Sequence, residues 1–258
     1  MLLKTNLFMI LYPNAKINIG LNILSKRRDD YHNISSIFYP VNHFYDILEV
    51  VYADKFIFSS SGISIPSEKN ICELAFDMIS ADYELPTSVQ IHLHKQIPIG
   101  AGLGGGSSDA SFTLIAINTL FDLGLTKSQL KNYAIRLGCD CPFFLENKPK
   151  YITGIGDKMC EVKLDLSEYI IKFINPHIHI NTSEYYKKCT PKFSNKDLRE
   201  LVQHPVSSWK STIENDFENI VFADFPQIKE MKLNLYKQGA IFASMTGSGS
   251  VLFGLFKK

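Results

Sequence analysis

The stretch "PIGAGLGGGSSDA", residues 98–110, holds five of the fifteen glycines in the chain. It runs directly into "SFTLIAINTL", residues 111–120, which is apolar with helical spacing. Glycine loses more conformational entropy on folding than other residues, so such a cluster has a local reason. A backbone that closely approaches a bulky anion, with the N-terminus of a helix pointing at it, is such a reason.

Two common phosphate-binding loops fit this stretch poorly. A P-loop requires G-x-x-x-x-G-K-[ST], and no Gly-Lys-Ser/Thr occurs here. The dinucleotide fingerprint G-x-G-x-x-G matches Gly100, Gly102 and Gly105, and Asp122 follows about twenty residues later. That fingerprint should follow a continuous apolar parallel strand, however. Here an alternating strand and Pro98 precede it, and Asp122 stands at the end of the helix rather than at a strand tip.

A third interpretation is an anion nest. Successive glycine N–H groups form a concavity that binds anions, and the positive end of a helix dipole favours the same charge. Ser107 and Ser108 add hydroxyl groups at the first helical turn. We favour this interpretation over a purely structural glycine turn, which is the alternative.

The composition is that of an ordinary globular protein. The chain has 258 residues, of which 45% are hydrophobic and 21% charged, and 27 basic residues against 26 acidic ones give a net charge of +1. The sequence contains no long run of one sign. Nucleic-acid and membrane-surface binding normally require a basic patch, so we expect neither kind of partner.

The cysteines and the N-terminus indicate an intracellular setting. Five cysteines are an odd number, which argues against a disulfide framework and favours a reducing compartment. The apolar start is interrupted at residues 4–6 and has no small-residue cleavage site, so we interpret it as a first strand. A cytoplasmic location is therefore expected.

The rest of the chain mixes strands and helices without regular alternation, which favours an α+β fold. Ser67 is the expected cap of a helix over 67–83, with an apolar face of Ile71, Leu74, Ala75 and Met78. Further helices are expected over 126–138, beginning at Thr126 and ending at Gly138, near 182–189 and 195–203, and within 214–238. Strands are expected in 7–24 with a break at 13–14, in 34–41, 46–52, 55–66, 88–98 and 169–176, in a hairpin at 151–162, and in a final strand–turn–strand at 240–256.

Several motifs together resemble the GHMP kinases, small-molecule kinases that include homoserine, mevalonate and galactose kinases. The phosphate loop of that superfamily has the form P-x-x-x-G-L-G-[SG]-S-S, and here the similar loop is residues 98–108 with the triple glycine 104–106. The other similar segments, in the expected order, are "PNAKINIGLNILSKRRDDYHNISSIF" at 13–38, "GCDCPFF" at 138–144, "TGIGD" at 153–157, "NDFE" at 215–218 and "MTGSGS" at 245–250.

The triple glycine at 104–106 and the Tyr31-His32 loop are most similar to one branch of this superfamily. Its acceptor is diphosphocytidyl methylerythritol, an intermediate of non-mevalonate isoprenoid synthesis, which is phosphorylated on its 2-hydroxyl. Two alternatives stay open: another GHMP kinase, of the homoserine or mevalonate type, and a nucleotide-binding regulator without catalysis on the same fold.

The resemblance implies two α+β lobes with the site in the cleft between them. The boundary would lie near residue 160, giving an ATP-binding N-terminal domain over 1–160 and a C-terminal domain over 161–258. The family usually continues past the last glycine-containing strand, so we expect the C-terminal domain to be shortened. The oligomeric state is left open between a monomer and a weak homodimer.

The resemblance also implies ATP and Mg²⁺ as cofactors and names the residues that meet ATP. They are Pro98, Ile99, Gly100, Ala101, Gly102, Leu103, Gly104, Gly105, Gly106, Ser107 and Ser108 in the loop, with Asn70 and Lys95 near the adenine. For Asn70 and Lys95 the alternative is a polar position on a helix or strand. No residue is assigned as a metal ligand.

Phosphoryl transfer depends on positioning and charge stabilisation, with a base for the proton of the acceptor. By resemblance Asp140 is that base, although a lone loop Asp is more often a cap or a solvated charge. Lys16 stands between apolar strand residues, an unusual place for a charge that has no anionic partner. The resemblance supplies Asp140 and a substrate oxygen as those partners; the alternative is a lysine at an exposed strand end.

The implied substrate residues are Asn18, Tyr31, His32 and Thr182. Tyr31 offers a flat face for stacking on cytosine, and the imidazole of His32 can hydrogen-bond the edge of the base. Tyr185 or Tyr186, close to Thr182, is a weaker candidate to close the other side. The His-x-His pairs at 92–94 and 177–179 and the Cys-x-Cys at 139–141 lack further ligands, so we expect no metal there.

Overall fold

The computed structural model describes residues 8–66, 69–192 and 197–258. They form two compact units, each built from several segments of the chain. Unit 1 contains the described residues of 1–15, 42–99 and 104–147, and unit 2 those of 16–41, 100–103 and 148–258. The units therefore interleave along the chain. The division into family domains at residue 160 is a separate matter and stays a prediction.

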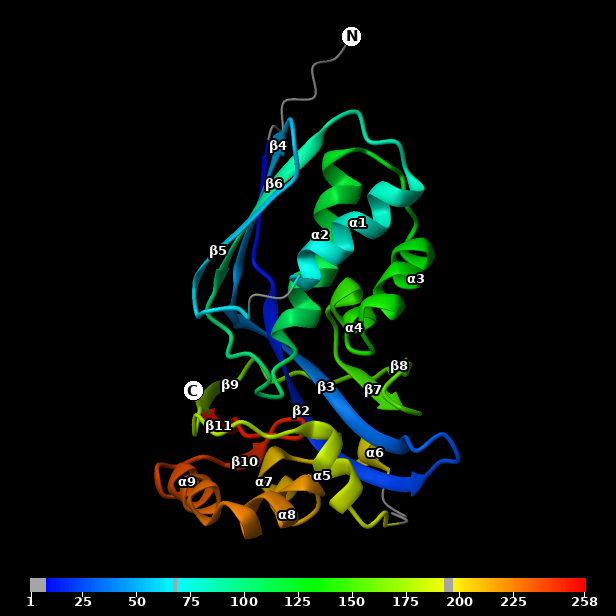
Figure 1. The fold of residues 1–258 in the computed structure, drawn as a ribbon. Coiled ribbons are helices and arrows are strands. Elements are labelled where there is room, and N and C mark those ends of the chain that lie inside the picture. The colour runs from blue at the N-terminus through cyan, green and yellow to red at the C-terminus, as the bar shows by residue number, and fades with distance from the viewer. Residues whose placement is uncertain (1–7, 67–68, 193–196) are drawn as a thin grey trace. The chain divides into compact units, whose positions relative to one another are not determined.

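Unit 1 is a four-stranded sheet with helices on one face (Figure 1). The strand order is β1-β4-β6-β5, in which β4 is antiparallel to both β1 and β6 and β5 is parallel to β6. The elements are β1 (Phe8–Leu11), β4 (Ile47–Ala53), β5 (Ile57–Gly62), α1 (Ile71–Asp82), β6 (Ser88–Lys95), α2 (Gly105–Leu120), α3 (Lys127–Leu137) and α4 (Cys141–Glu146).

The core of unit 1 lies between this sheet and its helices. Alternate residues of β6, namely Val89, Ile91 and Leu93, are buried in one apolar cluster that also holds residues of α1, α2 and α3, as the alternating pattern predicts. The expected boundaries of α3 are confirmed, because Thr126 caps its start and Gly138 its end. The predicted strand break is present one position earlier, at residues 12–13, since β1 ends at Leu11 and β2 begins at Asn14.

Helix α1 differs from its prediction in its start and in its buried face. It begins at Ile71, capped by Asn70 in a capping box with Glu73, whereas Ser67 lies outside the described residues. The buried positions are Cys72, Ala75, Phe76 and Ile79, while Leu74 is 41% exposed. The predicted face is therefore right for Ala75, and for Ile71 and Met78, which are partly buried against the core, but wrong for Leu74. Apolar residues occupy more than one side of this helix, so the sequence offers two overlapping stripes. Stacking of Phe76 on Phe56 accompanies the stripe that is buried.

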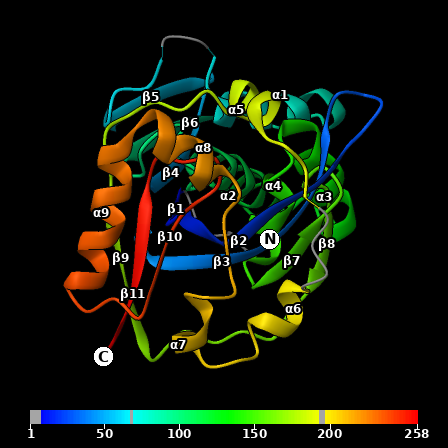
Figure 2. The same cartoon turned by 90° about the horizontal axis from the view of Figure 1, so that it is seen from below.

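Unit 2 contains two sheets and the C-terminal helices (Figure 2). The first sheet has the order β2-β3-β7-β8 and the second, entirely antiparallel, the order β10-β11-β9. The first residues of β2 and the last of β3 fall in unit 1. The elements are β2 (Asn14–Lys26), β3 (His32–Tyr45), β7 (Lys150–Thr153), β8 (Lys158–Glu161), β9 (Tyr169–Ile174), α5 (Thr182–Lys188), α6 (Leu198–Leu201), α7 (Val206–Trp209), α8 (Phe217–Asp224), α9 (Pro226–Lys237), β10 (Phe242–Met245) and β11 (Leu252–Lys257).

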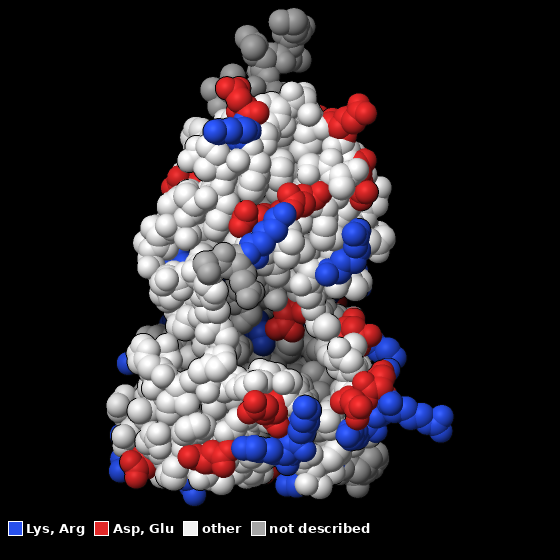
Figure 3. All heavy atoms as spheres, in the orientation of Figure 1, with Lys and Arg blue, Asp and Glu red and all other residues white. Residues whose placement is uncertain are grey.

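The core of unit 2 joins its sheets to α5, α8 and α9. Phe217 and Val221 of α8, Leu235 of α9 and Met245 of β10 are all buried in one cluster. The glycine hairpin β7–β8 and the closing pair β10–β11 are confirmed. On the face drawn in Figure 3 the Lys and Arg side chains are interspersed with Asp and Glu. No helix among the described residues is long and apolar enough to cross a membrane.

Candidate active site

The glycine-rich stretch leads into α2 within the triple glycine. Gly104 is the N-cap in the left-handed conformation (φ 71°), and the helix begins at Gly105. The first hydrogen bond of the helix is donated by the backbone N–H of Ser108 to Gly104. The N–H groups of Gly105, Gly106 and Ser107 therefore precede the helical hydrogen-bond ladder, as an anion nest requires. The hydroxyl of Ser108 is buried and has no partner among the described residues.

Gly105 and Gly106 have different reasons to be glycine. A Cβ on Gly105 would lie 2.8 Å from both Lys95 Nζ and Ile97 Cγ2, so packing within unit 1 explains this glycine. A Cβ on Gly106 would meet nothing within 4 Å, and its backbone does not require glycine. Gly106 is also exposed. Protein packing therefore leaves Gly106 unexplained, whereas close approach of a ligand to the backbone explains it.

The later glycine motif, residues 246–250, contacts the first one within unit 2. Gly102 has φ +79°, and a Cβ on it would lie 2.1 Å from the carbonyl oxygen of Thr246. The hydroxyl of Thr246 donates to the carbonyl of Gly102 at 3.0 Å. The motif therefore packs against residues 100–103 and supports them, in addition to forming the turn between β10 and β11. Asn215 fixes it in turn, because its amide donates to the carbonyls of Met245 and Gly247.

Lys16 and Asn18 lie side by side on β2 in a buried polar network of unit 2. Lys16 is 3% exposed, donates to Asn18 Oδ1 at 2.6 Å, and places Nζ 4.3 Å from the ring centre of Phe38. Asn18 donates its amide to Ser36 and its backbone N–H to the hydroxyl of Thr246. The structure excludes the alternative of an exposed lysine at a strand end.

Asp140 stands at the start of the short helix α4 in unit 1 and is partly exposed. Its backbone is at the N-cap position, but its side chain makes no capping bond there, so it is not a helix cap. Helix α4 is anchored to α2 by the buried Ser111, whose hydroxyl lies 2.7 Å from the carbonyl oxygen of Cys141 and 2.8 Å from that of Ser107. This contact ties the turn that carries Asp140 to the first turn of α2.

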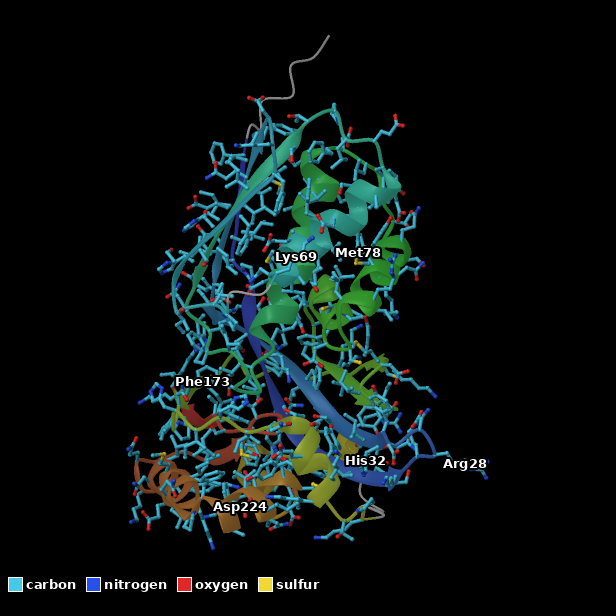
Figure 4. The ribbon with its side chains drawn as sticks, viewed as in Figure 1. Arg28, His32, Lys69, Met78, Phe173 and Asp224 are labelled. Carbon is cyan, nitrogen blue, oxygen red and sulfur yellow. The ribbon has the colours of Figure 1, made fainter. Side chains whose placement is uncertain are left out.

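The predicted cytosine residues lie on β3, before it, and on α5, all within unit 2. The ring of His32, labelled in Figure 4, stacks on Tyr186 with ring centres 5.4 Å apart and planes inclined by 19°. Burial lowers the pKa of His32, and the nearby charge of Lys26 lowers it further. Tyr31 is 60% exposed, which leaves its ring free of core packing. Thr182 pairs its hydroxyl with that of Ser248 at 2.7 Å.

The two residues expected near the adenine have structural partners in unit 1. The side chain of Asn70 accepts from the backbone N–H of Cys72 as the cap of α1. Lys95 is 3% exposed and forms ion pairs with Asp46 and Asp109. The alternative of a polar strand position is thus wrong for Lys95, because its ammonium group is buried.

The first His-x-His pair, on β6, lies against serine hydroxyls of β5. The rings of His92 and His94 hydrogen-bond the hydroxyls of Ser59 and Ser61. Among the residues that the structure describes, no three His, Cys, Asp or Glu side chains are placed to hold a metal ion.

Comparison with known proteins gives the family. The model of the GHMP kinase N-terminal domain matches residues 69–147, and that of the C-terminal domain matches 191–258. A protein of Azobacteroides pseudotrichonymphae named 4-diphosphocytidyl-2-C-methyl-D-erythritol kinase is 46% identical over 97% of this chain and 94% of its own length. One of the same name from Parabacteroides distasonis is 45% identical, over 97% and 92%. The chain belongs to the 4-diphosphocytidyl-2-C-methyl-D-erythritol kinase family of GHMP kinases.

Solved structures agree with this family. The crystal structure of a 4-(cytidine 5'-diphospho)-2C-methyl-D-erythritol kinase aligns with a TM-score of 0.85 at 29% identity, covering 96% of this chain and 90% of that one. A mevalonate kinase of Methanococcus jannaschii aligns with a TM-score of 0.74 at 14% identity, over 98% and 92%, which shows a shared fold. Sequence reasoning assigned no role to Thr246, Ser111 or Asp109, whose contacts with Asn18, Cys141 and Lys95 are seen only in the structure.

Proposed function

We propose that this GHMP kinase transfers the terminal phosphoryl group of ATP, bound as its Mg²⁺ complex, to the 2-hydroxyl of 4-diphosphocytidyl-2-C-methyl-D-erythritol. The products are the 2-phosphate and ADP, and the reaction serves non-mevalonate isoprenoid synthesis in the cytoplasm. The choice of substrate is supported by the 46% and 45% identity to two kinases of that name, each over 97% of this chain. Mg²⁺ enters as part of the substrate, and no side chain is assigned to it.

Residues 98–108 are proposed to hold the phosphates of ATP. Three N–H groups at the start of α2 lack helical partners, and the positive end of the helix dipole favours negative charge there. The buried hydroxyl of Ser108 has a free hydrogen to donate to a phosphate oxygen. The exposed backbone of Gly106 supports the same assignment, because a side chain there would stand between the helix and a phosphate.

Asp140 and Lys16 are proposed to act on the acceptor hydroxyl. Asp140 would take its proton, since Ser111 fixes the turn that carries it. Lys16 would stabilise the negative charge that develops on the oxygen. Its ammonium is held by Asn18, and a buried charge acts more strongly than one in water.

The cytosine is proposed to bind beside His32 and Tyr31. The stack of His32 on Tyr186 fixes the imidazole plane, so its ring nitrogens have a defined direction for hydrogen bonds to a base. This arrangement makes Tyr186 a stronger candidate than Tyr185, which is buried and donates to Asp224. Thr182 and Asn18 are proposed to contact the rest of the substrate.

The experiment is release of ADP by the purified chain with MgATP and one acceptor at a time. The acceptors are the diphosphocytidyl alcohol, homoserine and mevalonate. We expect turnover with the first alone. Turnover with homoserine or mevalonate instead would keep the phosphate loop and refute the cytosine site. Binding of ATP without turnover of any acceptor would indicate a non-catalytic regulator.

A further inference from the structure

Three charged side chains are buried together in unit 1 at the base of the glycine-rich stretch. Asp46, between β3 and β4, is 0% exposed, Lys95 at the end of β6 is 3% exposed and Asp109 on α2 is 1% exposed. Lys95 Nζ donates to Asp109 Oδ2 at 2.8 Å and forms a second, shorter ion pair with Asp46. These three residues are called the buried triad below.

The triad contacts the chain on both sides of the stretch. Asp46 Oδ1 accepts from the backbone N–H of Gln96 at 2.5 Å and of Ile97 at 2.8 Å, immediately before Pro98. Asp109 follows Ser107 and Ser108 on the first turns of α2. One lysine therefore links the chain that enters the stretch to the helix that leaves it.

The first residue of α2 rests directly on this lysine. The space for a Cβ at Gly105 is taken by Lys95 Nζ and Ile97 Cγ2, each 2.8 Å away. Lys95 Nζ and Ile97 Cγ2 therefore leave no room at Gly105 for a side chain, and the start of α2 packs closely on the triad. Displacing Lys95 would displace Gly105 and the unpaired N–H groups beside it.

The triad is a poor device for stability alone. Burying two carboxylates and an ammonium costs desolvation, and an apolar cluster of similar volume often stabilises a fold as well or better. Asp109 Oδ1 accepts no hydrogen bond among the described residues. Burial raises the pKa of Asp109 above its ordinary range, and the charge of Lys95 opposes that shift. Because the cost of burying Asp109 is not fully offset by hydrogen bonds, we expect the triad to fix the local geometry rather than to add stability.

We propose that Asp46, Lys95 and Asp109 are positioning residues for ATP, which hold the two ends of residues 98–108 at a fixed separation before the nucleotide binds. The proposal rests on the proposed function, in which this stretch binds the phosphates. A cradle that is already ordered loses less entropy on binding, so the triad acts on the affinity for ATP. The triad should have no effect on the affinity for the acceptor.

The test compares two substitutions at Asp109. In Asp109→Ala the tie between Lys95 and α2 is lost, but the neutral pair of Lys95 and Asp46 remains. In Asp109→Asn the amide oxygen can still accept from Lys95. The control is Ile117→Val, a core change further along α2. For each protein the Kd for MgATP is measured by calorimetry, KM for each substrate and kcat by ADP release, and Tm by thermal denaturation.

We expect Asp109→Ala to raise the Kd and KM for ATP about tenfold, equivalent to about 1.4 kcal/mol, with the KM for the diphosphocytidyl alcohol within twofold of wild type. Asp109→Asn should restore most of the ATP affinity, and Ile117→Val should change Tm but not the Kd. Unchanged ATP affinity in Asp109→Ala, or an equal change in Ile117→Val, would overturn the proposal.

Two further outcomes separate the proposals. If wild type does not bind ATP, the proposed function fails and this inference fails with it; if wild type binds ATP and only the Asp109 comparison fails, the inference alone is wrong. Should Asp109→Ala not fold, Asp109→Ser replaces it, since its short hydroxyl cannot reach Lys95, and the same tenfold loss is expected.

Discussion

Gly105 and Gly106 are adjacent in sequence, yet their substitution should have opposite effects. Gly105→Ala places a methyl group 2.8 Å from Lys95 Nζ and Ile97 Cγ2, so we expect a loss of about 1–3 kcal/mol in the free energy of unfolding. Gly106→Ala enters open space in a helix, so stability should be unchanged or higher by up to about 1 kcal/mol. Its ATP affinity should nevertheless fall at least about tenfold, equivalent to about 1.4 kcal/mol. Thermal denaturation and ATP titration measure both; wild-type affinity in Gly106→Ala would contradict phosphate binding at this backbone.

His32 should make acceptor binding sensitive to acid. Burial, and after it the charge of Lys26, lowers the pKa of His32 below the ordinary value of about 6.5. The imidazole is therefore neutral at neutral pH and gains a proton only at a lower pH. Because the folded state disfavours the proton, stability from this group is present above the ordinary pKa and is lost as pH falls below it. We expect the KM for the acceptor to be constant from pH 7 to 8 and to rise on acidification. His32→Gln should have a higher KM without this rise, and an unchanged acid dependence would contradict the assignment.

The turn between β10 and β11 supports β2 and residues 100–103 through one hydroxyl. Thr246 accepts from Asn18 N–H at 3.1 Å and donates to Gly102 at 3.0 Å, and Asn18 in turn holds Lys16. Thr246→Val keeps the shape and removes the hydroxyl, so buried groups lose partners at about 1–3 kcal/mol each. We expect kcat to fall about tenfold or more, a change of at least about 1.4 kcal/mol.

Thr246→Ser is the matched control for this prediction, because it keeps the hydroxyl and loses a methyl group. It should retain a kcat within a few-fold of wild type even where its Tm is lower. Steady-state kinetics and thermal denaturation of the two variants separate packing from hydrogen bonding. A kcat that follows Tm in both variants would show that Thr246 acts only on stability.

Local patterns predicted most elements but not their partners. Thr126 and Gly138 predicted the two ends of helix α3, and strict alternation of apolar residues predicted the buried face of β6. The predicted buried face of α1 was shifted to include the exposed Leu74, because apolar residues occupy more than one side of this helix. For the site, Lys16 was indicated by a charge among apolar strand residues. Thr246 gave no such signal, because it acts on Asn18, 228 positions away in sequence, and an ordinary turn threonine looks the same.

The interleaving of the two units has the same origin. Residues 16–41 group with 148–258, a pairing that depends on contacts such as β3 with β7 that no local pattern encodes. The consequence for function is that Lys16 belongs to unit 2 and Asp140 to unit 1. Whether Lys16 and Asp140 act on the same hydroxyl is therefore tested by the rates of single and double variants.

Asp140→Asn should lower kcat about 10²–10⁴-fold, the usual contribution of a general base. The Kd for ATP and Tm should stay near wild type, because the carboxylate does not cap α4. Lys16→Met should also lower kcat. If both residues act on one hydroxyl, the double variant should be little slower than the slower single variant, since residues that act as a unit are non-additive. Single-turnover rates of the four proteins at saturating ATP measure this, and rate losses that multiply would mean that Lys16 and Asp140 act in separate steps.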